Sequence, residues 1–371
     1  MPYGRTENNM LQRKEMTTLL INVISTKMLL TFPKIMIIDS GNSAWMQVIY
    51  NTIVVFLLFW VAVFFYRGNK NMIEIADRLG GKALKIPVGL LVFIVLVINS
   101  ASIIRIFPET IKMVLLQDFR VEFIIAAFLI AVGVGAYMGI EAIGKINHMF
   151  MPVAAVVFLA FLLLLIPYYR LENILPLFGE GYKSIFVKGF NTISLFSDLI
   201  LLNILLPHCE NLYEARKSGK KAILISGLIA LLILVSYCLI YPYPVSKDFM
   251  IPVYQMSRII HLSSFFSRFE AMFQFIWSIL MLLYSAIYIY SMCYVWQTTF
   301  SLKHYKPLIF PIVLIIGIIG MLPGSVLDLM KAEEIENIIV YPVAFLLPII
   351  FGIISRRYYG EKRKENNSEK V

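Results

Sequence analysis

Two ionisable side chains interrupt long apolar stretches of the sequence, and their chemistry is that of an ion pair or a ligand site. Lys27 lies in the first apolar stretch, and Asp198 lies in a later one that reads SLFSDLILLN. A charged group at membrane depth is costly and normally meets a ligand, an ion or an opposite charge. We therefore expect Lys27 to pair with Asp198 or to meet a ligand carboxylate. The alternative for Asp198 is one interhelical contact that only holds helices together.

Each of these charges lies near a predicted break in its helix. Pro33 lacks an amide hydrogen and crowds the preceding turn, so the first helix should kink or break between Met28 and Pro33. Ser197 and Asp198 compete for backbone hydrogen bonds, which favours a second interruption at residues 196–198. Backbone groups freed inside a bilayer must be satisfied by protein, water or a ligand. For the first helix alone, a proline kink without a ligand is the alternative.

Further polar side chains recur in two other apolar stretches. Asn99 and Ser102 are three residues apart and share a helix face, as do Tyr284 and Tyr288, four apart. Aromatic residues at that spacing pack more often than they bind, so packing is the alternative there. Hydroxyls and freed backbone groups would bind the polar end of a ligand, and aromatic rings would enclose its apolar end. The expected ligand-binding residues are Thr26, Lys27, Thr31, Asn99, Ser100, Ser102, Phe196, Ser197, Asp198, Tyr284, Ser285 and Tyr288.

The composition identifies the elements that must position these residues as membrane-spanning helices. Of the 371 residues, 59% are hydrophobic and only 15% are charged, whereas soluble domains have about 25% charged residues. A spanning helix needs about 20 apolar residues. About ten stretches qualify, and the ninth is the shortest: Thr17–Asp39, Ala44–Tyr66, Ile86–Phe107, Val121–Gly139, Ile146–Tyr168, Ile185–Leu206, Ala222–Tyr241, Ala271–Thr298, Tyr305–Leu322 and Ile338–Ile354.

The distribution of lysine and arginine predicts the orientation. Most of these residues fall in alternate connections and in both terminal segments, which predicts that both termini are cytoplasmic. The expected division is a cytoplasmic tail at 1–16, a permease-like membrane domain at 17–356 and a short, charged tail at 357–371 that we expect to be disordered. The net charge of +10 then reflects topology and attraction to anionic lipid, and nothing further supports nucleic-acid binding.

Two connections are more than turns. Residues 69–82 have apolar side chains at helical spacing and end in two glycines, which predicts an amphipathic helix at the inner surface. Residues 243–269 have an apolar face and either cap the outer mouth of a cavity or form an interfacial helix without a gating role. The sequence contains no P-loop, nucleophile elbow or HExxH motif, and its Cys and His residues lack metal-ligand spacing. We expect no enzyme activity, cofactor or metal.

The two interrupted helices, the first and the sixth, are five spans apart in a ten-span chain. That pattern is typical of an all-α membrane protein built from two inverted five-helix repeats, with the substrate site at the midplane. No convincing residue-level repeat joins the two halves. The coincidence of the two breaks favours a midplane site over an isolated proline kink.

Several motifs in order resemble the spore germination permease family, the B subunit of the nutrient germinant receptors of endospore-forming bacteria, within the amino-acid/polyamine/organocation superfamily. The resemblance covers nearly the whole chain. It rests on Pro33 with Gly41-Asn42-Ser43-Ala44-Trp45, Ile104-Arg105, Gly139-Ile140-Glu141 with Ile146-Asn147, Leu175-Pro176, and Arg268-Phe269-Glu270-Ala271 with Trp277.

The resemblance implies a five-plus-five inverted repeat with a small germinant, often an amino acid, between helices 1, 3, 6 and 8. It also implies a receptor complex with an A subunit and a lipoprotein C subunit in the inner membrane of the dormant spore. Two departures from the family pattern matter. Thr26-Lys27-Met28 stands where small residues are usual, and Phe196-Ser197-Asp198 stands where Phe-Gly-Glu is frequent. Met28 would narrow the pocket, and the Lys27 ammonium can stand in for a coupling cation.

Three functions follow as hypotheses. The first is a non-enzymatic germinant sensor that passes a change in the bundle to partner subunits. The second is an ion-coupled secondary transporter of amino acids or related solutes, with Lys27 and Asp198 in the coupling machinery. The third is a scaffold whose pocket is vestigial.

Overall fold

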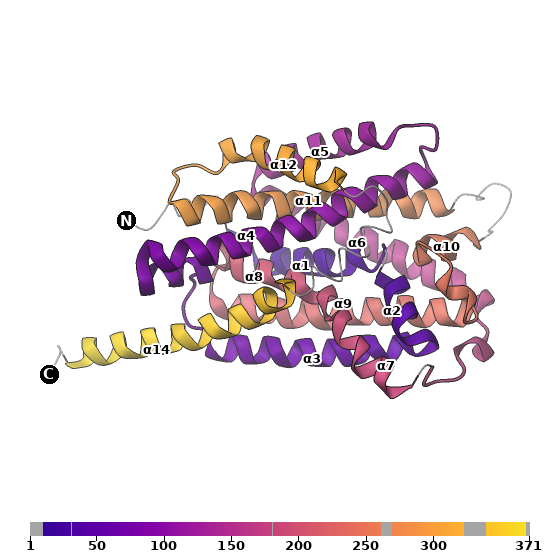
Figure 1. The fold of residues 1–371 in the computed structure, drawn as a ribbon, viewed down its shortest axis with the longest axis horizontal. Coiled ribbons are helices and arrows are strands. Elements are labelled where there is room, and N and C mark those ends of the chain that lie inside the picture. The colour runs from indigo at the N-terminus through magenta and orange to yellow at the C-terminus, as the bar shows by residue number, and fades with distance from the viewer. Residues whose placement is uncertain (1–9, 31, 180, 261–268, 323–338, 369–371) are drawn as a thin grey trace.

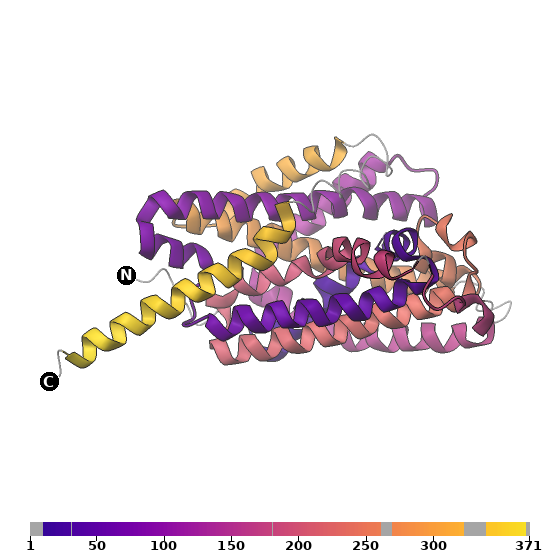
Figure 2. The same cartoon turned by 60° about the horizontal axis from the view of Figure 1, so that its bottom comes forward.

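The computed structural model describes residues 10–30, 32–179, 181–260, 269–322 and 339–368, and these residues form a helical bundle (Figure 1). The longest helices run along one common axis in both views (Figures 1 and 2). The principal elements are α1 (Arg13–Lys27), α2 (Phe32–Ser40), α3 (Ala44–Phe65), α4 (Met72–Val114), α5 (Val121–Met138), α6 (Ile140–Leu165), α7 (Tyr182–Phe186), η5 (Lys188–Leu199), α8 (Ile200–Ile204), α9 (Leu212–Ile240), α10 (Pro252–Arg258), α11 (Phe269–Phe300), α12 (Ile309–Met321), η9 (Pro342–Leu346) and α14 (Leu347–Ser368).

Membrane spans account for most of this architecture. Among the described residues, eight helical stretches are long and apolar enough to cross a membrane. One of them, Phe32–Phe65, joins α2 to α3, and α12 lies in a shorter apolar helix. With α1 and α2 taken as one interrupted span and α12 as another, the helices correspond to the ten predicted stretches. The prediction of an all-α membrane fold is confirmed.

The first span is broken where the sequence predicts. Helix α1 ends at Lys27 and α2 begins at Phe32. The amides of Met28 and Leu29 donate to carbonyls three residues back, at 3.0 and 3.1 Å, so the helix tightens before it stops. Pro33 lies in the first turn of α2, where a missing amide hydrogen removes no intrahelical bond.

The sixth span is interrupted too. Its middle is η5, a 3-10 helix of 12 residues, which gives way to the five-residue helix α8 at Ile200. Runs of 3-10 helix longer than three or four residues are uncommon. The predicted interruption at 196–198 is therefore confirmed: these residues lie in the last turns of the 3-10 helix, and the change of helix type follows Leu199.

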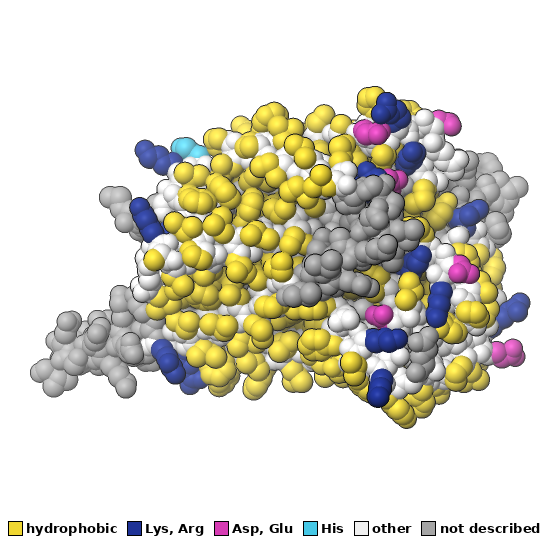
Figure 3. All heavy atoms as spheres, viewed as in Figure 1, with side chains coloured by type: hydrophobic (Ala, Val, Ile, Leu, Met, Phe, Trp, Pro, Cys, Tyr) yellow, Lys and Arg dark blue, Asp and Glu magenta, His cyan; other side chains and the backbone are white. Residues whose placement is uncertain are grey.

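The two interrupted spans lie together inside the bundle. Helix α1 packs against α6, α9, α11 and η5, and most of its side chains are buried. Helix α4 packs along α11, and α2 also lies against η5. Figure 3 shows hydrophobic side chains across the middle of the visible face and basic side chains toward its two ends, as expected of a bundle that crosses a membrane. The segments that carry Lys27 and Asp198 are thus held at its centre.

Two connections and the C-terminal segment also contain helices. Asn71 caps the start of α4 through a reciprocal capping box with Glu74, and Gly81, at φ +56°, kinks the helix. The residues between the cap and the kink form the helix that the sequence predicts at 69–82. In the connection at 243–269, α10 packs against α2, α9 and α11, whereas residues 261–268 lie outside the described ones. The prediction of a disordered tail is wrong, because α14 continues to Ser368 and projects beyond the bundle (Figure 1).

Candidate functional site

A buried ion pair joins the two interrupted spans. Lys27, the last residue of α1, places its Nζ 3.0 Å from Oδ1 of Asp198 in η5. The two side chains are only 8% and 0% exposed. Because charges this far from water lose their hydration, each depends on the other for compensation. Lys27 was expected either to pair with Asp198 or to meet a ligand carboxylate, and in the structure it pairs with Asp198.

Two tyrosines of α11 bind the same carboxylate. The hydroxyl of Tyr288 donates to Oδ1 of Asp198, and that of Tyr284 lies 3.4 Å from the same atom. Their rings stack with centroids 4.8 Å apart, as expected of residues one turn apart on a helix. Oδ1 therefore receives three donors, whereas the buried Oδ2 has no hydrogen-bond partner among the described residues.

The Lys27 ammonium has two further acceptors. It donates to Oδ1 of Asn99 in α4 at 3.0 Å and to Oγ of Ser197 at 3.2 Å. With the bond to Asp198, these contacts use all three of its hydrogens. The pair thus brings together α1, α4, η5 and α11, which are segments of the first, third, sixth and eighth spans.

The remaining predicted site residues divide into four groups. Thr26 donates to Asn22 at 2.6 Å, and Ser102 donates to the carbonyl of Ile98 in its own helix at 3.4 Å, so these hydroxyls are used elsewhere. Phe196 is fully buried in the hydrophobic core. The hydroxyls of two predicted residues are buried without a hydrogen-bond partner in the described part of the chain: Ser100 and Ser285. Thr31 lies outside the described residues.

A polar contact between α1 and α6 was not in the predicted site. Asn22 donates to Oδ1 of Asn147 at 2.8 Å and to the carbonyl of Leu280 at 3.2 Å, and it accepts from Thr26. The signal available in the sequence was the position of Asn22, one turn before Thr26 on the same helix face. This network continues the line of buried polar groups from Lys27 along α1.

The arrangement provides complementary groups for a small polar molecule. Lys27 is a cation at the end of α1, and Asp198 offers one carboxylate oxygen that the described residues leave without a donor. Ser100 and Ser285, which follow Asn99 and Tyr284 in the sequence, also have buried hydroxyls without a hydrogen-bond partner among the described residues. Among the described residues, no group of three or more His, Cys, Asp or Glu side chains could hold a metal ion.

Solved structures with the same fold are membrane transporters. The nucleobase-cation-symport-1 family transporter Mhp1, solved with bromovinylhydantoin bound, is similar with a TM-score of 0.70 and 14% identity, over 95% of this chain and 80% of that one. MhsT in complex with L-phenylalanine gives 0.55 and 13%, over 93% and 95%. A manganese transporter mutant from Eremococcus coleocola gives 0.51 and 11%, over 92% and 76%. At these identities the likeness shows the fold alone, an inverted five-helix repeat with interrupted helices 1 and 6.

The sequence comparison is more specific. Residues 10–327 match the family described as spore germination protein. Spore germination protein B2 of Bacillus subtilis (strain 168) is 23% identical over 214 residues, which are 56% of this chain and 57% of that relative. The chain belongs to the spore germination permease family. It is a germination-related, multi-pass membrane protein, and the resemblance noted in the sequence is confirmed.

Proposed function

We propose that the chain is the membrane subunit of a spore nutrient germinant receptor and senses a small, amino-acid-like germinant. The observation that carries the proposal is the buried Lys27–Asp198 pair, which joins the breaks of the first and sixth spans. In this fold the substrate site lies between such interrupted helices. Family membership supports the link to germination. The proposal includes a complex of this chain with an A subunit and a lipoprotein C subunit in the spore inner membrane.

A zwitterionic ligand has the charges needed to replace this ion pair. The ligand carboxylate would pair with the Lys27 ammonium, and the ligand ammonium would pair with the Asp198 carboxylate, so each buried charge would keep an opposite charge beside it. Exchange of the internal pair for two pairs with the ligand would change how α1 is held against η5. A ligand shifts the two arrangements by its difference in affinity for them. That shift is the signal passed to the partner subunits.

A second candidate function is ion-coupled secondary transport of an amino acid or a related solute. The specific observation in its favour is the fold, which the chain shares with solved transporters such as Mhp1 and MhsT. Here Lys27 and Asp198 would belong to the coupling machinery. A scaffold with a vestigial pocket is the third candidate, supported by Met28, which is fully buried at the break of the first span.

The germination response of spores tests the site. Spores that carry Lys27→Met or Asp198→Asn should need a much higher nutrient concentration, or should fail to germinate, at wild-type protein abundance. The matched control is Lys85→Met, because Lys85 is also buried and paired, with Asp77 at 3.2 Å, but lies outside the interrupted helices. An unchanged dose–response for both site variants would remove these residues from the germinant site. A wild-type response after deletion of the gene, in a strain without a duplicate receptor, would favour the scaffold.

Proteoliposomes that contain only this chain separate sensing from transport. The sensor proposal predicts binding of the nutrient without accumulation inside the vesicles. Saturable, concentrative uptake driven by a proton or sodium gradient would establish the transporter function in its place. Lys27→Met should weaken nutrient binding in the same preparation, and Lys85→Met should leave it unchanged.

A further inference from the structure

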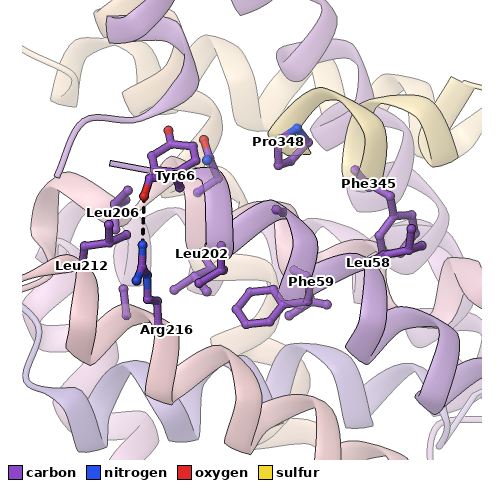
Figure 4. A pocket seen from close by; sticks show the side chains of 15 residues that line it. Leu58, Phe59, Tyr66, Leu202, Leu206, Leu212, Arg216, Phe345 and Pro348 are labelled. Carbon is purple, nitrogen blue, oxygen red and sulfur yellow. Dashed lines mark hydrogen bonds between the residues drawn. The ribbon is translucent and has the colours of Figure 1, made fainter. Parts of the chain in front are cut away.

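Two arginines converge on one backbone carbonyl at the end of the bundle where α1 begins. Nη2 of Arg216, in the first turns of α9, donates to the carbonyl of Tyr66 at 2.8 Å (Figure 4). Nη1 of Arg67 donates to the same oxygen at 3.1 Å. Nitrogens that share one acceptor at these distances lie within about 6 Å of each other, where like charges repel. The arrangement therefore concentrates positive charge.

No carboxylate forms an ion pair with either arginine within the described residues. Glu214 lies two residues before Arg216 in α9, but its carboxylate contacts Arg13, at 3.1 Å. Arg356 of α14 lies near the same helix end, with its guanidinium over the rings of Phe64 and Phe65. Moreover, the buried Nε of Arg216 has no hydrogen-bond partner in this part of the chain. An anion would satisfy it and relieve the repulsion.

An apolar cavity of about 60 Å³ is lined by Arg216 and by Tyr66, the residue whose carbonyl both arginines contact (Figure 4). Its polar lining comes from Tyr66, Asn203 and Arg216. The other lining residues are apolar and belong to α3, to the segment from η5 through α8 to the start of α9, and to η9 and α14. Several wall residues of α3 are partly exposed on the outer surface of the bundle, among them Leu58, Phe59 and Val63. The cavity thus joins a cationic end to a hydrophobic wall.

We propose that this cavity binds an anionic phospholipid, with the lipid phosphate between Arg67 and Arg216 and part of an acyl chain against the apolar wall. A free phosphate would use the arginines but not the cavity, whereas a neutral lipid would use the cavity but not the arginines. Basic pockets between membrane helices are typical sites for anionic headgroups. The charge distribution of the sequence assigns this end to the cytoplasmic side, where the facing leaflet is negatively charged.

The lipid site would connect the sixth span, which holds Asp198, to three helices that the ion pair does not contact: α3, α9 and α14. Its walls come from α3, from α8 and α9 of the sixth and seventh spans, and from η9 and α14 of the last span. A bound lipid would therefore pack between α14 and the segment that follows Asp198. We expect it to stabilise this packing.

Lipid retention by the purified full-length chain tests the site. The chain in neutral detergent is titrated with phosphatidylglycerol, with phosphatidylcholine of the same acyl chains, and with inorganic phosphate, followed by native mass spectrometry and thermal unfolding. The double variant Arg67→Gln/Arg216→Gln should bind phosphatidylglycerol about 30-fold more weakly, since each surface cation contributes about 1 kcal/mol. Leu58→Trp, which fills the cavity from its partly exposed wall, should also weaken retention. The matched control is Lys217→Gln, whose ammonium lies over the Tyr213 ring at 4.1 Å.

Each outcome decides the proposal. Preference for phosphatidylglycerol over phosphatidylcholine in the wild-type chain, lost in the arginine variant and kept in the Lys217 variant, supports it. Equal retention of the two lipids by the wild-type chain overturns it, and that measurement does not depend on the folding of any variant. Thermal stabilisation by inorganic phosphate equal to that by phosphatidylglycerol also overturns it, because the site would then bind a free anion. Unchanged affinity in both Arg67→Gln/Arg216→Gln and Leu58→Trp places the lipid elsewhere.

Discussion

Tyr288 donates to the same oxygen of Asp198 that the Lys27 ammonium contacts. The carboxylate is therefore asymmetric, with Oδ1 bound by these donors and Oδ2 without a hydrogen-bond partner among the described residues. One oxygen holds the interrupted spans to α11. The other is the atom to which a ligand can bind without removing an existing bond.

Removing one member of the pair should destabilise the protein more than removing both. Lys27→Met leaves the fully buried Asp198 without a positive charge beside it, and breaking such a pair costs roughly 3–5 kcal/mol. The double variant Lys27→Met/Asp198→Leu should recover most of this loss. The measurement is thermal unfolding in detergent.

Lys85→Met is the matched control for this cycle. Its partner Asp77 has a side chain that is 45% exposed, so water can solvate the carboxylate left behind. The loss in the control should therefore be smaller than that in Lys27→Met. Additive losses in the double variant at the site would contradict the coupling between Lys27 and Asp198.

The two tyrosines should contribute unequally to stability. Tyr288→Phe removes a hydrogen bond to a charged group, which is worth about 1.5–3 kcal/mol. Tyr284→Phe removes a contact of 3.4 Å, near the limit for a hydrogen bond, and should cost less. Denaturation of the two matched variants under the same conditions gives the comparison. A larger loss for Tyr284→Phe would show that its hydroxyl is the main support of Asp198.

A close backbone approach between Gly179 and the end of α2 predicts a difference between two glycines. A Cβ at Gly179 would lie 2.5 Å from the carbonyl oxygen of Ser40, at the end of α2, and its φ is +47°. Gly181 also has a positive φ, +98°, but a Cβ there meets nothing within 4 Å. Gly181→Ala should cost about 1–3 kcal/mol from backbone strain alone, and Gly179→Ala should cost more because it also displaces Ser40. Equal melting temperatures for the two variants would contradict the contact.

Acidification should destabilise the protein through His208, which lies between the sixth and seventh spans. Burial lowers the pKa of His208 from 6.5 to about 4, and its Nε2 shares a hydrogen bond with Tyr290 at 3.0 Å. The unfolded chain thus binds a proton that the folded protein does not. The contribution is complete above pH 6.5 and is lost as the pH falls toward 4. From pH 7 to pH 5 this loss is about 2 kcal/mol.

The variant His208→Gln isolates that effect. Glutamine keeps a polar group near Tyr290 but does not titrate, so the decrease in melting temperature between pH 7 and pH 5 should become smaller. The same decrease in the wild-type protein and in His208→Gln would assign the pH dependence to other groups.

The sequence was sufficient for features set by local chemistry. Pro33 predicted the break of the first span because proline cannot continue a helix, and the structure has it between Lys27 and Phe32. The cost of isolated charges at membrane depth gave two expectations for Lys27, pairing with Asp198 or contact with a ligand carboxylate, and in the structure Lys27 is paired with Asp198.

Side-chain directions were less predictable, because helix type and packing decide them. Thr26 faces Asn22, although it lies next to Lys27 in the sequence. The 3-10 geometry around Asp198 turns the chain by a larger angle per residue than an α-helix does. Arg67 and Arg216 meet at one carbonyl only because the ends of α3 and α9 adjoin, and no local pattern in the sequence connects them.

The attachment of Lys27 to α1 has a consequence for how the site responds to its surroundings. A dissolved cation occupies a site in proportion to its concentration and its affinity. The Lys27 ammonium is instead tethered beside Asp198, so its effective concentration there is set by the length of its own side chain. Neither dilution nor a change of salt removes it. Charge balance between the interrupted helices is therefore supplied by the chain itself and persists whatever the ionic composition of the medium.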